Sequence, residues 1–564
     1  MDSEAEVKVC ASRTPRSCPL QTAWSAARVL LSSRAMSATL HTTELSTAES
    51  SARPSLVIAV TVAGIYFLAL LLSSTRYGYF RDALYYLACG EHLAWGYVDQ
   101  PPLIALLAWI ARHTLGTSLP ALMFWPALAG AGRVVLTAAF ARELGAKKFG
   151  VAFAAVLAAT PGVWYVIDHQ FAMNALEAPF WTGCAYAILR MIRTENTRYW
   201  ILFGAIAGLA LENKYSIAVF AFALLAGLLL TPQRKYLFTP WLFAGGAVAL
   251  LIFLPNLIWN IQHHWPFLEL MHNIRESGRD VVLSPGQFLW QQILIMNPNS
   301  AIFWMIGLLY YFFSHTARLF RVFGWAFAIT IAFFLLAHGK NYYSAPAYPI
   351  VLAGGALAVD HFFRGVRFAG RSGLRAALQT VLVVLVILGI FPLLPVVLPV
   401  LPVDSYLHYQ EHLPIAVPRS EHGHLGAALP QHYADEFGWE EMVAKTARIY
   451  HGLTPEEQAK TAIFANNYGE AGAIDFFGPN YGLPKAISGH QTYFYWGPRN
   501  YTGEIMIILG SADPDNDRKF FKDVQVVADL NNAYTVPSER RAILLCRRLK
   551  ENLQTLWPEL KHWD

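Results

Sequence analysis

The sequence predicts an all-α polytopic membrane protein of about eleven spans, followed by a C-terminal soluble domain of mixed α/β type. Of its 564 residues, 55% are hydrophobic and only 14% are charged, whereas soluble proteins usually carry about 25% charged residues. The apolar residues gather in long runs such as Trp241–Ile261 and Ala376–Leu401. Runs of this length are typical of membrane spans, because about 20 apolar residues cross the hydrocarbon core.

Length and apolarity predict the individual spans. The candidate ranges are 55–74, 119–141, 150–167, 173–191, 199–212, 215–231, 239–261, 299–314, 321–337, 346–363 and 376–401. The apolar segment Pro102–Ile110 is too short to cross. We expect it to lie on the membrane surface or to dip into it.

Basic residues in the short loops predict the orientation of these spans. If the N-terminus is cytoplasmic, every short basic loop falls on the cytoplasmic side, in agreement with the positive-inside rule. The residues concerned are Arg142, Lys147, Lys148, Arg190, Arg193, Arg198, Arg234, Lys235, Arg318, Arg321, Arg364, Arg367, Arg371 and Arg375. The extracytoplasmic side then receives the segments 73–120, 167–172, 262–297 and 338–345 and the tail, which is residues 403–564. Glu212-Asn213-Lys214 is then an outer turn between two short spans.

Three parts of the chain follow from this topology: an N-terminal extension (1–53), a transmembrane domain (54–402) whose first outer loop is 73–120, and an extracytoplasmic domain (403–564). The extension is rich in Ser, Thr, Ala and Arg and lacks apolar periodicity, which predicts disorder. Met36 opens an equally plausible N-terminus. In the tail, 439–449 is helical in pattern, and 462–464 and 505–509 are strand-like. The tail is long enough to have a core of its own.

The cysteines predict neither a metal site nor a disulfide in the tail. No pair has metal-ligand spacing, and one cysteine alone lies after residue 402, so the tail cannot close an internal disulfide. We expect free or buried thiols at Cys10, Cys18, Cys89, Cys184 and Cys546.

Two carboxylates stand out in the first outer loop. The loop reads Tyr79-Phe80-Arg81-Asp82-Ala83-Leu84-Tyr85-Tyr86 and later Gly96-Tyr97-Val98-Asp99-Gln100-Pro101-Pro102-Leu103. Carboxylates at a membrane boundary are costly unless they are paired or used. Asp82 is therefore either a functional group, the partner of Arg81 or a helix cap. Asp99 is either functional or a turn residue before Pro-Pro.

The other outer segments add a further acid and two lysines. Helical spacing places Asn174 and Glu177 on one face of a span, near its outer end. The alternative is a capping group with a snorkelling Glu. Lys214 can neutralise a phosphate as a point charge, or it can simply snorkel.

Lys340 begins the fourth outer segment and is followed by Tyr342 and Tyr343. A lysine beside aromatic rings suits a phosphate together with a sugar face or a lipid. The alternative is an aromatic anchor at the membrane interface.

Together these residues place acids and cations on one membrane face. An acid can take the proton of an acceptor hydroxyl, and cations can stabilise a departing phosphate. This combination favours group transfer from a phosphate-linked lipid. No Walker or Rossmann motif is present, and nucleotide-sugar chemistry is disfavoured because the acids face outward, away from nucleotide pools. Adjacent His263 and His264 point in different directions on a helix and do not favour zinc. The alternative is a transporter or flippase of lipid-linked sugars, but it would need polar residues at the membrane midplane, whereas this sequence keeps them at one face.

The stretch Tyr79–Leu103 resembles the first-loop signature of the family 39 glycosyltransferases, which include protein O-mannosyltransferases and lipid A aminoarabinose transferases. The matching residues are Asp82, Tyr85, Tyr86, Gly96, Tyr97, Asp99, Pro101, Pro102 and Leu103. Further resemblances follow in the same order at 173–181, 208–215, 340–349 and 467–498, so that the likeness covers about 55–510.

The resemblance implies a GT-C fold and an inverting transfer from a polyprenyl-phosphate sugar to a lipid, glycan or protein, in the inner or plasma membrane. It implies Asp82 as the base and Lys214 and Lys340 as ligands of the donor phosphate. We expect Asp99 and Glu177 as further acids. Other candidate substrate contacts are Tyr85, Tyr86, Asn174, Tyr342 and Tyr343.

One residue departs from the family's pattern. The usual Glu after the first-loop Asp is Ala83 here. A slower enzyme, an enzyme that uses Glu177 or Asp99 instead, and an inactive family member all remain open. The resemblance implies no certain cofactor and leaves a divalent metal open, and it implies no nucleic-acid partner.

Overall fold

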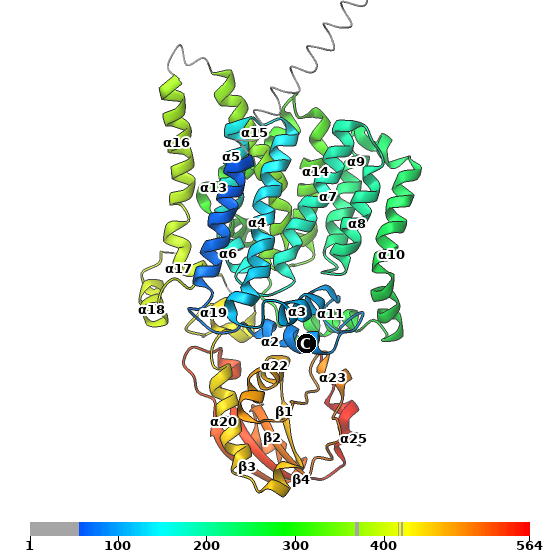
Figure 1. Cartoon of the computed structure of the whole chain (residues 1–564), viewed down its shortest axis with the longest axis vertical. Coiled ribbons are helices and arrows are strands. Elements are labelled where there is room, and N and C mark those ends of the chain that lie inside the picture. The colour runs from blue at the N-terminus through cyan, green and yellow to red at the C-terminus, as the bar shows by residue number, and fades with distance from the viewer. Residues whose placement is uncertain (1–55, 367–371, 415–416, 419–420) are drawn as a thin grey trace, which may run out of the picture. The chain divides into compact units, whose positions relative to one another are not determined.

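The computed structural model describes residues 56–366, 372–414, 417–418 and 421–564. Ile58–Asp564 form one compact unit. The predicted disordered extension and two of the predicted cytoplasmic residues, Arg367 and Arg371, lie outside the described residues. Figure 1 shows the chain as a bundle of helices followed in sequence by a small sheet with its own helices.

Five helices in the described part of the chain are long and apolar enough to cross a membrane. They are Leu56–Ser73, α4 (Leu119–Leu144), α10 (Pro240–Gln262), the segment Arg318–Leu336 that contains α14 (Arg321–Leu336), and Ser372–Val397, which begins with α16 (Ser372–Leu388). The number rises to seven if each of two bent helix pairs is counted as one span. These pairs are α5 (Lys148–Ala159) with α6 (Gly162–Asp168), and α12 (Pro285–Ile295) with α13 (Pro298–Phe313).

The predicted number of eleven spans is not confirmed. The remaining bundle helices are α7 (Asn174–Thr194), α8 (Tyr199–Leu211), α9 (Ile217–Leu229) and α15 (Tyr348–Gly365). α8 and α9 have 13 residues each, which at a rise of 1.5 Å per residue gives about 20 Å. That length is well below the roughly 30 Å of a hydrocarbon core. The break between them lies at the predicted turn 212–214.

Prolines mark where several helices begin. α10, α12, α13 and α11 (Pro266–Ser277) each have a proline at the start. A proline is well suited to the first helical turn, because its missing N–H would have no partner there. The predicted outer segment 262–297 therefore holds two short helices, α11 and α12, rather than a loop.

The first predicted outer loop also folds into short helices, α2 (Arg81–Glu91) and α3 (Leu103–His113). α3 covers the segment that was expected to be a short surface element. α2 is buried along its length, from Ala83 to Gly90. The fourth outer segment forms a 3-10 helix, η3 (Asn341–Ala347).

The tail contains a four-stranded sheet in the order β1-β2-β4-β3. β1 (Thr461–Ala465) runs parallel to β2 (Ile505–Ser511), and the other pairs, with β3 (Phe521–Asp529) and β4 (Ala542–Leu549), are antiparallel. The predicted strands and the predicted helix, here α20 (Trp439–His451), are confirmed. The other tail helices are α18 (Val403–Glu411), α19 (Gln431–Ala434), α21 (Pro455–Gln458), α22 (Tyr468–Phe477), α23 (Tyr493–Trp496), α24 (Pro514–Asp517) and α25 (Leu553–Leu556).

Alternate residues of the strands face two different cores. On one face, Ala462, Met506 and Leu544 pack with Trp557 in a core made of tail residues. On the other face, the alternating residues of the same strands join a core that also contains Leu84 and Tyr85 of α2. Because side chains alternate along a strand, one sheet builds both a core of the tail and a core shared with the first loop.

Candidate active site

Asp82 lies in the first turn of α2 and is reached by a residue of the tail. The Tyr468 hydroxyl donates to Asp82 Oδ1 at 2.8 Å, and Arg81 Nε lies 3.8 Å from the same oxygen. Burial raises the pKa of Asp82, while Arg81 and the hydrogen bond from Tyr468 oppose this shift. The side chain keeps 28% of its surface exposed, so it can meet a hydroxyl group of a substrate.

Asp99 is the second carboxylate of this group. It accepts a hydrogen bond from the Tyr85 hydroxyl at 2.8 Å, and that hydroxyl lies 2.8 Å from the hydroxyl of Thr492 in the tail. Burial raises the pKa of Asp99 to about 7, and the negative charge of Asp82 adds to the effect. Tyr86 is buried, and its pKa is raised by burial first and then by both carboxylates. The two acids and the two tyrosines predicted in the first loop therefore share one site.

A second group joins three residues that the sequence singled out. Lys214 Nζ donates to Asn174 Oδ1 at 2.6 Å and to Glu177 Oε2 at 3.0 Å. The ammonium also lies 4.8 Å from the centre of the Tyr343 ring. Asn174 and Glu177 thus share one face of α7, and Glu177 is paired with Lys214 and also accepts a hydrogen bond from Ser216.

Lys340 belongs to a buried ion-pair cluster with the third outer segment and the tail. Its Nζ lies 2.6 Å from Glu421 Oε1 and 3.3 Å from Asp280 Oδ1. Burial alone would raise the pKa of Glu421, but Lys340, Arg81 and Arg279 together hold it well below its usual range. Three cations of different segments therefore act on one carboxylate.

Tyr342 and Tyr343 connect these groups. Their ring centres are 4.9 Å apart. The pKa of Tyr342 is raised first by burial and also by Glu421 and Asp82, whereas Tyr343 contacts Lys214. The pair therefore lies between the acids of the first loop and both lysines, and all ten candidate residues fall into one neighbourhood.

The tail contributes residues that the sequence did not reveal as candidates. Tyr468 is 386 positions from Asp82, and Thr492 is 407 positions from Tyr85. No spacing pattern connects residues that far apart. The family resemblance at 467–498 was the only signal, and it gave no role to Tyr468 or Thr492. The tail also supplies Glu421 to the lysine cluster.

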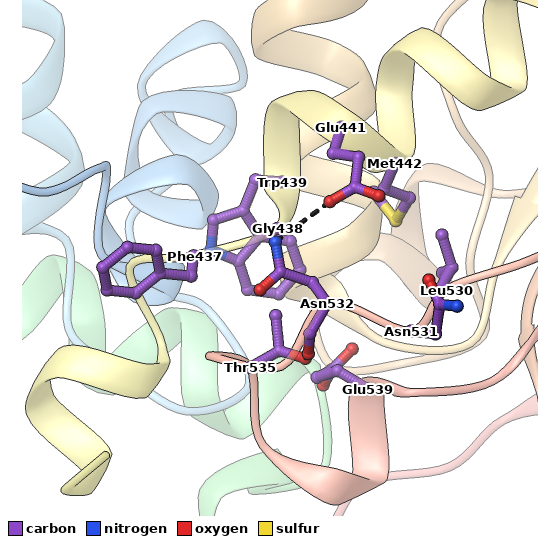
Figure 2. A pocket seen from close by; sticks show the side chains of 10 residues that line it. All are labelled: Phe437, Gly438, Trp439, Glu441, Met442, Leu530, Asn531, Asn532, Thr535 and Glu539. Carbon is purple, nitrogen blue, oxygen red and sulfur yellow. Dashed lines mark hydrogen bonds between the residues drawn. The ribbon is translucent and has the colours of Figure 1, made fainter. Parts of the chain in front are cut away.

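A small pocket lies in the tail at the start of α20, between Phe437–Met442 and Leu530–Asn532. Figure 2 shows Asn532 donating to Glu441 across it, at 3.0 Å. Glu539, in its wall, also accepts from Asn467 at 3.3 Å. Asn467 directly precedes Tyr468, which donates to Asp82. The pocket therefore lies next to a residue that contacts Asp82 and is not lined by Asp82 or Asp99.

The described residues contain no group of three His, Cys, Asp or Glu side chains placed to hold a metal ion. Within the same part of the chain, Cys89, Cys184 and Cys546 are free and buried, as expected. The remaining two cysteines, Cys10 and Cys18, lie outside the described residues.

Known proteins resemble this chain in part of its sequence and in its fold. The family model described as dolichyl-phosphate-mannose-protein mannosyltransferase matches residues 99–259, a range that includes Asp99, Glu177 and Lys214. No curated protein matches the sequence.

The solved structures that match include ArnT from Cupriavidus metallidurans, bound to undecaprenyl phosphate and in the apo state. The bound form superposes with a TM-score of 0.54, and the apo form with 0.52. Sequence identity is 15% in both cases, and the match covers 88% of this chain and 98% of ArnT. The chain therefore has an ArnT-like GT-C fold, and residues 99–259 within it are similar to the dolichyl-phosphate-mannose-protein mannosyltransferase family.

Proposed function

We propose that the chain transfers a sugar from a polyprenyl-phosphate donor to a lipid, glycan or protein acceptor, at the extracytoplasmic face of the inner or plasma membrane and with inversion. The observation that carries this proposal is the convergence of a partly exposed carboxylate, Asp82, with a second acid and two lysines. The ArnT structure bound to undecaprenyl phosphate supports the choice of a polyprenyl-phosphate donor.

Contacts between the predicted outer segments support one common side. Asp82 of the first segment contacts the tail, and Asp280 of the third bridges to Glu421 of the tail. Lys340 of the fourth contacts the same glutamate. Because these segments lie at one end of the bundle, a donor in the outer leaflet and an acceptor from outside would meet at the same site.

In the proposed reaction, the acceptor hydroxyl attacks the anomeric carbon while Asp82 takes its proton. The bond between the anomeric carbon and the phosphate oxygen breaks, and the polyprenyl phosphate leaves with the electron pair. Lys214 and Lys340 stabilise the negative charge on the leaving phosphate. A single displacement from the opposite face inverts the anomeric configuration.

Both lysines are already paired with carboxylates in this structure. A phosphate at Lys340 has to compete with Glu421 and Asp280, and one at Lys214 has to lie beside the charge of Glu177. An ammonium has three donors, and Lys214 uses two of them for Asn174 and Glu177. Lys214 therefore has one donor left for a phosphate oxygen without breaking a contact.

Ala83, which replaces the family's usual glutamate, is 1% exposed and packs in the shared core. The second acid near Asp82 is instead Asp99, whose pKa responds to the charge of Asp82. We infer that Asp99 takes the place of the missing carboxylate, which argues against an inactive family member.

The test is turnover of a panel of radiolabelled polyprenyl-phosphate sugars by membranes that contain the wild type, Asp82→Asn or Asp404→Asn. Asp404 is an exposed carboxylate that accepts from Tyr534 at 2.7 Å, so its variant controls for the loss of one charge. We expect sugar release by the wild type and by Asp404→Asn, and a loss of at least about 100-fold in Asp82→Asn. Full activity of Asp82→Asn would refute this base. Movement of the intact donor across the membrane without sugar release would indicate a flippase.

A further inference from the structure

The start of α22 is fixed by a complete helix cap. The side chain of Asn467 accepts from the N–H groups of Gly469 and Glu470, at 2.9 and 3.0 Å. The side chain of Glu470 in turn accepts from the N–H of Asn467, which completes a capping box. Such boxes satisfy the free N–H groups at a helix start and set its geometry. The next residue along from the cap, Tyr468, is therefore held in place by its backbone.

The ring of Tyr468 is held as well. It stacks on His490, with ring centres 5.1 Å apart and an angle of 10° between the planes. The N–H of Tyr468 donates to His490 Nδ1 at 3.1 Å. The guanidinium carbon of Arg81 lies over the Tyr468 ring, 5.3 Å from the ring centre. The Tyr468 hydroxyl consequently points in one direction, toward Asp82.

A glycine permits the approach of α22 to α2. A Cβ atom at Gly472 would lie 2.9 Å from the carbonyl carbon of Leu84 and 3.0 Å from the N of Tyr85. Only a residue without a side chain allows this distance between two helix backbones. The result is the 2.8 Å hydrogen bond from Tyr468 to Asp82 Oδ1.

We propose that Tyr468 is a positioning residue that orients Asp82 and holds it in the ionised form able to accept a proton. The inference rests on the proposed function, in which Asp82 is the base. It makes the tail a part of the active site.

The ionisation of the two partners supports this role. Burial raises the pKa of Tyr468 well above 10, and although Arg81 opposes the shift, the charge of Asp82 adds to it. The hydroxyl therefore stays protonated and donates. A hydrogen bond to a carboxylate favours its charged form. It lowers the pKa of Asp82 against the effect of burial.

Several other groups act on Asp82 from the elements packed around it. Arg81 favours the ionised form, whereas the nearby negative charges of Asp435 and Glu421 disfavour it. Further groups that interact electrostatically with Asp82 are Tyr86, Asp99 and Tyr342. None of these residues is changed by a substitution at Tyr468, so the variant isolates one hydrogen bond.

The experiment compares the full-length wild type with Tyr468→Phe and Tyr493→Phe. Tyr493 is the matched control: it lies in the same tail and donates to a buried carboxylate, Asp475 Oδ2, at 3.0 Å. In Tyr468→Phe, we expect the acidic limb of the kcat/KM profile to move to higher pH. At pH values below that limb, the loss should be roughly 10- to 100-fold, as for a hydrogen bond to a charged group. The plateau at high pH should stay near that of the wild type, and Tyr493→Phe should keep the acidic limb in place.

A titration independent of turnover accompanies the kinetics. The carboxylic-acid infrared band that Asp82→Asn removes is followed against pH in the wild type and in Tyr468→Phe. We expect its midpoint at higher pH in Tyr468→Phe. An unchanged midpoint, or a loss of activity by one factor at every pH, would overturn the positioning role and leave the proposed function intact. A shifted midpoint in a protein without sugar transfer would support the hydrogen bond and reject the proposed function.

Discussion

Replacing Asp99 by asparagine tests how the first loop holds a carboxylate that water cannot fully solvate. Burial is the main reason that the pKa of Asp99 stands at about 7, against an ordinary value of 3.8. The folded protein therefore keeps a proton on Asp99 in the range in which the unfolded chain has lost it. Stability falls as pH rises through that range and is level above it. Asparagine does not titrate, so the variant escapes this loss.

The size of the effect follows from the two pKa values. The difference between about 7 and 3.8 corresponds to about 4 kcal/mol, of which about 3 kcal/mol falls between pH 5 and pH 8. The unit Ile58–Asp564 has an unfolding entropy of about 1 kcal/mol/K at ordinary values per residue. We therefore expect the melting temperature of Asp99→Asn to gain about 3 °C on that of the wild type over this interval.

The assay is thermal unfolding in detergent at several pH values between 5 and 8, for the wild type, Asp99→Asn and Asp404→Asn. Asparagine Oδ1 can still accept from Tyr85, so the hydrogen bond at 2.8 Å is kept and only the charge is lost. The curve of Asp404→Asn should run parallel to that of the wild type, because its carboxylate is exposed. Parallel curves for Asp99→Asn and the wild type would refute the reasoning, since Asp99 would then not titrate in this interval.

Three further substitutions test the packing around the site. Glu421→Gln replaces the charged partner of the buried Lys340 at 2.6 Å by a neutral one and leaves Asp280 as its carboxylate partner. The variant should lower stability by about 3 kcal/mol. An unchanged melting temperature would contradict this, and adding Lys340→Met should restore part of the loss. Ala83→Glu should lower the melting temperature and should not raise sugar transfer. Position 83 is 1% exposed, and a buried charge without a partner is costly. Faster sugar transfer would instead show that the site accepts the family's usual Asp-Glu pair. Gly472→Ala should reduce sugar transfer by separating α22 from α2. Gly423→Ala should have no effect, because a Cβ atom at Gly423 would have its nearest neighbour, Ser538 Oγ, at 3.9 Å. Equal activities of the two variants would argue against the close approach.

The sequence predicted the elements whose signal is local. Residues typical of a strand or a helix lie within a few positions of one another in 462–464, 505–509 and 439–449. The structure has β1, β2 and α20 at these places. The number of spans was harder to predict, because hydropathy shows that a segment is apolar but does not show how long its helix is in the folded bundle. α8 and α9 are apolar throughout but have 13 residues each. The third outer segment was missed as structure, since its helices are short and begin at prolines.

The candidate residues were predicted better than their partners. Asp82, Asp99, Lys214 and Lys340 were recognisable because charged groups at a membrane boundary are rare and costly. What holds them in place depends on contacts between segments that are far apart in the chain. The pairing of Lys340 with Glu421 and the hydrogen bond of Tyr468 to Asp82 follow from tertiary packing, and a single sequence contains no pattern that records it. The roles of these residues stay predictions until they are tested.

The two carboxylates of the first loop are supported in the same way. Asp82 receives a hydroxyl donor from the tail directly, through Tyr468. Asp99 accepts from the Tyr85 hydroxyl of its own loop, and that hydroxyl lies 2.8 Å from the hydroxyl of Thr492 in the tail. The first loop and the tail also share a hydrophobic core, so the contacts that fold the tail onto α2 are the contacts that orient both acids. Ionisation of the site is therefore coupled to the packing of the tail. If that shared core opened, Asp82 would lose its donor Tyr468, and Tyr85, the donor to Asp99, would lose its contact with Thr492.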